Sequence, residues 1–142
     1  MRQFQDTIKS GDEGDSYFVA WLIKKGFTDV RRTDRYCHWD LEAKFRGVKW
    51  VFELKNRTFP TFTYGDVFLN KDKWDYLKEV PEKAVLVTFY TDKWLMIDIK
   101  SREPDEITQQ LCKRQTVFND HRMVNKDVVK WYLDGLKLLD YD

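Results

Sequence analysis

Two short runs of alternating polar and apolar side chains, separated by a glycine, occupy residues 39–57. Successive side chains of a strand point to opposite faces, so the two runs around Gly47 predict a β-hairpin. Its apolar face, which we expect to enter a core, consists of Trp39, Leu41, Ala43, Phe45, Trp50, Phe52 and Leu54. Asp40 then lies on the opposite face, where Val51, Glu53 and Lys55 also project. The alternation therefore predicts two carboxylates and an ammonium group on one face of the hairpin.

A helical period precedes the hairpin, over residues 12–26. The segment begins with acidic side chains, which suit the positive end of a helix, and ends with lysines and Gly26, which suit its C-terminus. Its predicted apolar face consists of Phe18, Val19, Leu22 and Ile23. Residues 27–32 predict a short strand between this helix and the hairpin.

The segment after the hairpin, residues 56–69, is rich in Thr, Phe and Pro and predicts an irregular loop beside the charged face. A helix is expected over residues 70–80, with Asn70 as its N-cap. Residues 84–90 are continuously apolar or β-branched, which is typical of a strand buried on both faces, and residues 93–99 are expected to return beside it.

The C-terminal third has a weaker pattern. Residues 107–112 predict a short helix, residues 115–118 an edge strand, and residues 126–139 a closing helix. The inward face of this closing helix is expected to consist of Val129, Leu133 and Leu136. The resulting order of helix, three strands, helix and two strands predicts an α/β fold with a mixed central sheet flanked by helices, in one domain over residues 1–142.

Composition agrees with an ordered domain, since 142 residues with 42% hydrophobic and 16% aromatic side chains can bury a core without disulfides or structural metal. The net charge of +1 gives no global basic field, so binding to a polyanion would depend on local clusters of Lys and Arg. Cys37 and Cys112 are too few for a disulfide framework. We expect a cytoplasmic protein without a membrane segment, because the apolar runs are short.

The charged hairpin face has a chemical interpretation. Asp40 and Glu53 lie 13 residues apart, a spacing at which adjacent antiparallel strands bring two carboxylates together. Such a pair suits Mg²⁺, which takes oxygen ligands and keeps several waters. The ammonium group of Lys55 can orient a water and offset charge on a phosphate. Metal, nucleophile and charge stabilisation are the three requirements of phosphodiester hydrolysis.

The same residues resemble a known signature. Asp40 followed by Glu53-Leu54-Lys55 is similar to the PD-(D/E)XK motif of the restriction-endonuclease-like nuclease superfamily, with Trp39 where the motif usually has Pro. The acidic run at residues 11–15 and the Lys-Gly-Phe at residues 25–27 resemble the start of that fold in small Holliday-junction-resolvase-like members. The resemblance covers roughly residues 11–90 and implies an αβββαβ core.

The resemblance also implies roles for individual residues. Mg²⁺ or Mn²⁺ would be held by Asp40, Glu53 and the carbonyl of Leu54, and Lys55 would be the catalytic lysine. Asp15 would be the acid of the first helix, contributing through water, with Glu13 as the alternative. The three candidate nucleic-acid-binding residues are Arg57, Lys71 and Lys73.

The implied function is that of a Mg²⁺-dependent nuclease that hydrolyses phosphodiester bonds in branched or single-stranded DNA, directed by structure rather than by sequence, and acting as a homodimer. The alternative is a catalytically inactive nucleic-acid-binding or protein-interaction module on the same fold. Phe59, Phe62 and Tyr64 either stack on unpaired bases or pack beneath their loop. His38 shares the predicted face of Asp40.

Overall fold

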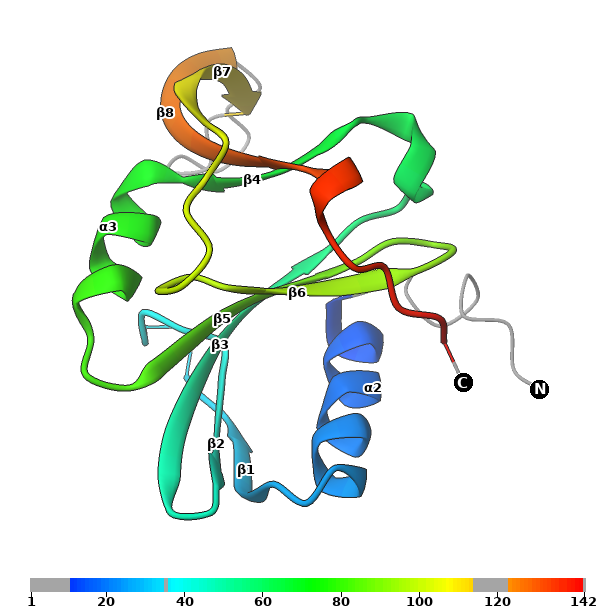
Figure 1. Cartoon of the computed structure of the whole chain (residues 1–142), viewed down its shortest axis with the longest axis vertical. Helices are drawn as coiled ribbons and strands as arrows, with labels where there is room; N and C mark the ends of the chain where they lie inside the picture. Colours follow the sequence, from blue (N-terminus) through cyan, green and yellow to red (C-terminus); the bar gives the residue numbers. More distant parts are fainter. Residues whose placement is uncertain (1–10, 35, 114–122, 142) are drawn as a thin grey trace.

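Two β-sheets and two α-helices form the part of the chain that the computed structural model describes, residues 11–34, 36–113 and 123–141 (Figure 1). No helix in these ranges is long and apolar enough to cross a membrane. The elements, in chain order, are α2 (Gly11–Lys24), β1 (Thr28–Arg32), β2 (Leu41–Phe45), β3 (Val48–Asn56), the 3₁₀ turn η1 (Thr61–Thr63), β4 (Asp66–Asn70), α3 (Lys71–Glu79), β5 (Lys83–Phe89), β6 (Trp94–Asp98), β7 (Glu106–Lys113), β8 (Met123–Tyr132) and the 3₁₀ turn η2 (Leu133–Gly135).

The central sheet has five strands in the order β1-β2-β3-β5-β6. The β3–β5 pair is parallel and the other pairs are antiparallel, so the predicted mixed sheet is confirmed. The predicted hairpin is β2–β3, in which Leu41 pairs with Phe52. Its turn has positive φ at both Arg46 (49°) and Gly47 (80°), the conformation that matches the twist of two paired strands.

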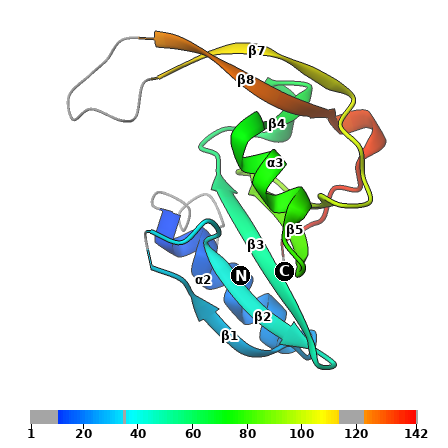
Figure 2. The same cartoon turned by 90° about the vertical axis from the view of Figure 1, so that its left-hand side faces the viewer.

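Helix α2 covers one face of this sheet, and α3 with the second sheet covers the other (Figures 1 and 2). The α2 side buries Phe18 and Leu22 against apolar side chains of β2, β3, β5 and β6. The opposite side buries a cluster that includes Val51, Val67, Trp74, Leu77, Leu86, Val129 and Trp131. Both sheets therefore share one apolar cluster.

Three sequence-based assignments to faces are wrong. Val51, expected on the polar face of the hairpin, is fully buried because α3 and the second sheet cover that face. Trp39 packs against the same cluster instead of the α2 side, since β2 begins only at Leu41. Ile23 of α2 is 59% exposed, although Phe18 and Leu22 of the same predicted face are buried.

The second sheet, β4-β8-β7, is the main departure from the sequence-based fold. The expected loop at residues 56–69 contains most of β4. The helices expected over 107–112 and 126–139 are wrong, because residues 107–112 lie in β7 and residues 126–132 in β8, which the 3₁₀ turn η2 follows. Strand β8 lies between β4 and β7 and pairs with both. Its β-branched and aromatic side chains suit a pleated surface. Residues 115–118 lie outside the described residues.

The β7–β8 pair extends beyond β4 (Figure 2). Pairing of β4 with β8 reaches only Asn70 and Val128, whereas pairing of β7 with β8 continues to Lys113 and Met123. The outer part of this pair is therefore a two-stranded projection from the body of the protein.

The first turn of α2 packs closely on the end of β3. Gly14 is buried, and a Cβ added to it would collide with the side-chain oxygen of Asn56. We expect Gly14→Ala to lower the free energy of unfolding by about 1 kcal/mol or more, because this overpacking outweighs the better helix propensity of Ala. Urea denaturation measures the change.

Two comparisons separate the collision from a general effect of the substitution. Gly65→Ala adds a Cβ that meets no atom within 4 Å, so we expect little change. In an Asn56→Ala background the collision is absent, and Gly14→Ala is expected to stabilise by about 1 kcal/mol through helix propensity alone. Equal stability of Gly14→Ala and wild type, with no reversal of sign in the Asn56→Ala background, would contradict the packing described.

Candidate functional site

Asp40 is held between the residues on either side of Glu53. Its backbone N–H donates to the carbonyl of Phe52 (2.9 Å), and its Oδ2 accepts a hydrogen bond from the backbone N–H of Leu54 (2.8 Å). The side chain thus takes the place of a β2 backbone acceptor just before that strand begins. The structure brings Asp40 beside Glu53, as the hairpin pattern predicts.

Glu53 is the buried member of the pair, with 5% of its surface exposed. Lys55 Nζ lies 3.6 Å from its Oε2, and Lys73 Nζ lies 3.6 Å from its Oε1. These separations are longer than ordinary N–H···O hydrogen bonds. Among the described residues, no group donates a hydrogen bond to Oε1, although this atom is buried. A buried carboxylate oxygen without a donor is costly and is the kind of atom that a cation would satisfy.

The surroundings of Glu53 disfavour its charged form. Burial raises the pKa of the Glu53 carboxyl, and the neighbouring Asp40 carboxylate raises it further. Lys55 and Lys73 lower it but do not compensate fully, so the pKa lies above its ordinary value. A divalent cation between the two carboxylates would reverse this balance.

The carbonyl of Leu54 faces the same side as Asp40. The N–H of Arg57 donates to Phe89 of β5, so odd-numbered residues at this end of β3 direct their backbone groups to β5. Leu54 directs its N–H away from β5, to Asp40, and the C=O of a strand residue points to the same side as its N–H. The carbonyl can therefore join the two carboxylates as an oxygen donor.

Asp15 approaches the end of β3 from the α2 side. The side-chain amide of Asn56 donates to its Oδ1 at 3.4 Å. Asn56 follows Phe52 and Leu54 on the α2 face of β3, whereas Glu53 and Lys55 lie on the α3 face. The contribution of Asp15 to metal binding stays a prediction. The side chain of Glu13, the alternative acid, lies outside the described part of the structure.

The donor set fits a hard cation that brings part of its own shell. In residues 11–34, 36–113 and 123–141, no group of three or more His, Cys, Asp or Glu side chains is arranged to hold a metal ion. Two carboxylates and one carbonyl are an incomplete oxygen shell, which suits Mg²⁺ or Mn²⁺ because these ions keep waters and accept substrate oxygens.

The sequence matches no family model and no curated protein. A solved structure with a similar fold is that of Hjc, a Holliday junction resolvase from the archaeal hyperthermophile Archaeoglobus fulgidus. The match has a TM-score of 0.52 and 14% sequence identity, and it covers 84% of this chain and 82% of that chain. This chain has a restriction-endonuclease-like fold. At this identity the likeness concerns the fold, and a fold does not by itself establish an activity.

Within the restriction-endonuclease-like core, Lys73 is a member of the site that the hairpin pattern does not reveal. It lies in the first turn of α3, and its Nζ donates to the carbonyl of His38 (3.0 Å) as well as approaching Glu53. The His38 ring stacks on Tyr76 of α3, with 4.0 Å between ring centroids. Helix α3 therefore holds the loop that precedes Asp40 in place through these two contacts with His38. Lysine in the first helical turn after Asn70 is the only local signal for this placement.

The other two predicted nucleic-acid-binding residues lie in different surroundings. Lys71 forms an ion pair with Asp75 of its own helix, at 2.9 Å. Arg57 follows Lys55 and lies over the ring of Phe68, 5.0 Å from the ring centroid. Of the three predicted contacts, only Lys73 reaches Glu53.

Proposed function

We propose that this protein is a divalent-metal-dependent nuclease that hydrolyses phosphodiester bonds in DNA, directed by structure rather than by sequence. The observation that supports it most strongly is the buried Glu53, whose Oε1 accepts no hydrogen bond from the described residues and which lies beside Asp40 and two lysines. The restriction-endonuclease-like fold supports the same reaction class.

Each residue has a separate role in the proposal. Asp40, Glu53 and the Leu54 carbonyl would hold Mg²⁺ or Mn²⁺, with Asp15 as a further contributor, and the ion would supply Lewis-acid charge neutralisation at the phosphate. Lys55 donates hydrogen bonds to the attacking water and to the phosphate oxygens on which negative charge develops. Lys73 fixes the loop before Asp40 through the His38 carbonyl.

The proposed substrate is branched or single-stranded DNA, and the proposed assembly is a homodimer. The protein with the similar fold is described as a Holliday junction resolvase, and two copies of a nuclease can cut two strands of a branched substrate. Arg57, Lys71 and Lys73 would contact phosphates, which position DNA without reading its sequence.

Cleavage assays on purified full-length protein test the proposal. Labelled single-stranded, duplex and four-way-junction DNA are incubated with Mg²⁺, with Mn²⁺ and with EDTA. We expect nicking of at least one substrate with either ion and none in EDTA. Absence of cleavage of all three substrates with both ions would reject the proposal.

A second candidate is an inactive nucleic-acid-binding or protein-interaction module on the same fold. Two ammonium groups already lie 3.6 Å from Glu53, so part of its charge is compensated without metal. Isothermal calorimetry separates the candidates: the nuclease requires Mn²⁺ binding that disappears in Asp40→Asn, whereas the module requires no such binding.

Lys73→Ala is expected to lower the cleavage rate about tenfold near neutral pH, an effect of about 1.4 kcal/mol. Lys73 lowers the pKa of Glu53, so its removal raises that pKa and shifts the acid limb of the pH–rate profile to higher pH. Lys71→Ala, the control on the same helix, is expected to leave the limb in place because Lys71 pairs with Asp75. Superimposable pH profiles for Lys73→Ala and wild type would contradict this coupling.

A further inference from the structure

A pocket of about 430 Å³ lies beyond the proposed cleavage site, where the end of β3 and the loop carrying η1 meet the second sheet. The lining residues that matter for its chemistry are Arg57, Phe59, Tyr64, Phe68, Tyr90 and Lys130. Four of these six are aromatic, and the other two are cations. Its volume is within the range of sites for small organic ligands.

Three aromatic side chains of the pocket contact one another, and one of the three is exposed. Phe59 contacts Tyr64 edge-to-face, with 5.1 Å between centroids, and lies 5.9 Å from Tyr90. Phe59 is half-buried and Tyr90 buried, whereas Tyr64 is 60% exposed. The Tyr64 ring therefore has surface available for stacking on a flat ligand, and it also contacts Phe59.

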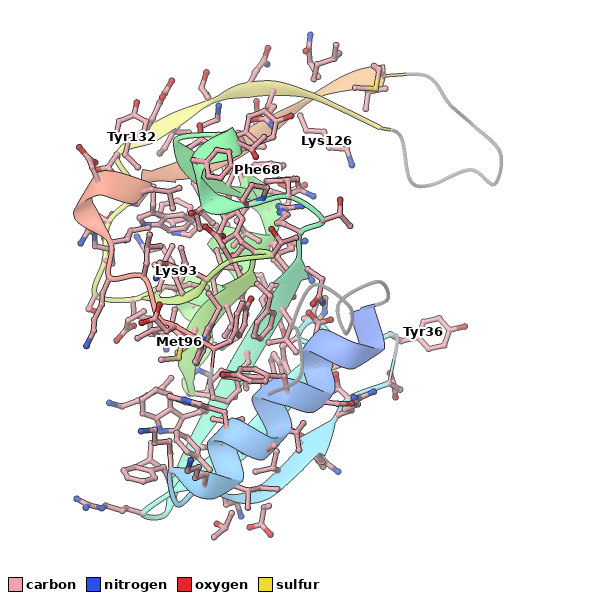
Figure 3. The ribbon with its side chains drawn as sticks, turned by 90° about the vertical axis from the view of Figure 1, so that its right-hand side faces the viewer. Tyr36, Phe68, Lys93, Met96, Lys126 and Tyr132 are labelled. Carbon is pink, nitrogen blue, oxygen red and sulfur yellow. The ribbon has the colours of Figure 1, made fainter. Side chains whose placement is uncertain are left out.

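The charges of the pocket favour an anionic ligand. Lys130 lies 3.6 Å from Asp66, so these two opposite charges compensate each other. The guanidinium of Arg57 lies 5.0 Å from the centroid of Phe68, on β4 beneath the β7–β8 pair (Figure 3). Two cations, Arg57 and Lys130, and one acid, Asp66, line the pocket next to aromatic rings, a combination that suits a nucleotide better than an uncharged ligand.

The pocket continues the proposed site along one strand face. Glu53, Lys55 and Arg57 are alternate residues, so their side chains follow one another on the side of β3 that faces α3 and the second sheet. Arg57 is two residues beyond Lys55, about 7 Å along an extended chain. A DNA strand with its scissile phosphate at the metal ion that Asp40 and Glu53 would hold would bring its next nucleotide to Arg57 and Tyr64.

We propose that this pocket binds one unpaired nucleotide of the DNA strand, with its base stacked on Tyr64 and its phosphate against Arg57. The inference rests on the proposed function for the position of the strand, and it specifies the substrate class. A base inside a duplex is stacked and cannot enter a pocket, so the pocket selects single-stranded segments or branch points.

A DNA oligonucleotide with a central 2-aminopurine, whose fluorescence changes when it stacks, tests the pocket in EDTA, where cleavage plays no part. Wild type is expected to bind the single strand with a fluorescence change. Tyr64→Ala should weaken binding about 5- to 150-fold and remove this change, the range known for loss of one base–aromatic stack. Tyr64→Phe keeps the ring and should restore both.

Phe62→Ala is the matched control, because Phe62 lies in the same loop and is 84% exposed but does not line the pocket. It should bind like wild type, and Tyr64→Ala should bind fully paired duplex like wild type. The proposal is overturned if wild type does not bind the single strand, or if Tyr64→Ala keeps its affinity and fluorescence change. If wild type cleaves no substrate but its binding to the single strand still depends on Tyr64, the nuclease assignment is rejected and the pocket is retained. The two failures are therefore distinguishable.

Discussion

Lys55→Ala is expected to reduce DNA cleavage at least 10²- to 10³-fold while leaving DNA binding nearly unchanged, a loss typical of removing one group that stabilises charge in a transition state. Lys55 Nζ lies 3.6 Å from Glu53 Oε2, and one third of its side chain is exposed, so the ammonium can reach both the carboxylate and an incoming phosphate. Single-turnover cleavage in Mg²⁺ and fluorescence anisotropy in EDTA measure the two properties separately.

Lys49→Ala provides the control on the same strand and the same face. Lys49 Nζ is engaged with Glu42 Oε2 at 2.9 Å, away from Glu53, so its loss removes an equal charge without touching the proposed site. We expect cleavage by Lys49→Ala to stay within about threefold of wild type. Similar rates for Lys55→Ala and Lys49→Ala would show that only general charge matters, and would remove Lys55 from the site.

The parts of the fold that the sequence predicts correctly are those whose pattern and partner are close in the chain. The β2–β3 hairpin closes through a two-residue turn, and α2 and α3 show their buried faces at helical spacing. Strands β5 and β6 are likewise joined by a short turn. In each case local side-chain alternation and turn chemistry determine the element.

The second sheet is missed because its strands pair over long distances in the chain. Val67 of β4 pairs with Trp131 of β8, and neither segment is long or regular enough to indicate the other. The spacing of Val129, Leu133 and Leu136 also fits a helix, so the periodicity is ambiguous. The segment up to Tyr132 is a strand rather than a helix because β8 forms backbone hydrogen bonds with strands on both sides.

The site divides in the same way. Asp40, Glu53 and Lys55 come together through the hairpin and were predicted from it. The sequence offers Lys73 only as a nucleic-acid contact, and its approach to Glu53 comes from the packing of α3 on the sheet, a tertiary contact. The nucleotide pocket likewise requires β4 and β8, so its lining could not be collected from the sequence, although the aromatic loop that contributes Tyr64 was recognisable.

Glu42 of β2 and Glu53 of β3 lie on the same face of the hairpin but in opposite electrostatic surroundings. Both carboxyls are 5% exposed, and burial raises the pKa of each. Hydrogen bonds from Lys49 and Arg31 reverse this at Glu42 and lower its pKa, so Glu42 is a satisfied structural group. Glu53 has Asp40 as a neighbour and more distant cations, so its pKa is raised. The contrast supports Glu53, rather than Glu42, as the proposed metal ligand.

Substituting Glu53 by Gln is expected to stabilise the metal-free protein while abolishing Mn²⁺ binding and cleavage. The isosteric amide removes a buried negative charge that faces Asp40. Because the folded-state pKa of Glu53 is raised, this side chain stabilises the folded protein below the unfolded-state pKa. That stabilisation is lost as the pH rises through the folded-state pKa. The gain in Glu53→Gln should therefore be present at neutral pH and disappear in acid.

Glu42→Gln is the matched control with the opposite sign. The pKa of Glu42 is lowered, so its charged form stabilises the protein above the unfolded pKa, and this stability is lost as pH falls through the folded pKa. Thermal unfolding is measured in EDTA between pH 4 and 7.5. At pH 7.5 the Tm of Glu53→Gln should be higher than that of wild type, and the Tm of Glu42→Gln should be lower. Each kcal/mol of stability corresponds to a change in Tm of about 2–8 °C. Calorimetry should show Mn²⁺ binding to Glu42→Gln but not to Glu53→Gln. A lower Tm for Glu53→Gln at pH 7.5, or Mn²⁺ binding as tight as that of wild type, would contradict the role assigned to this carboxylate.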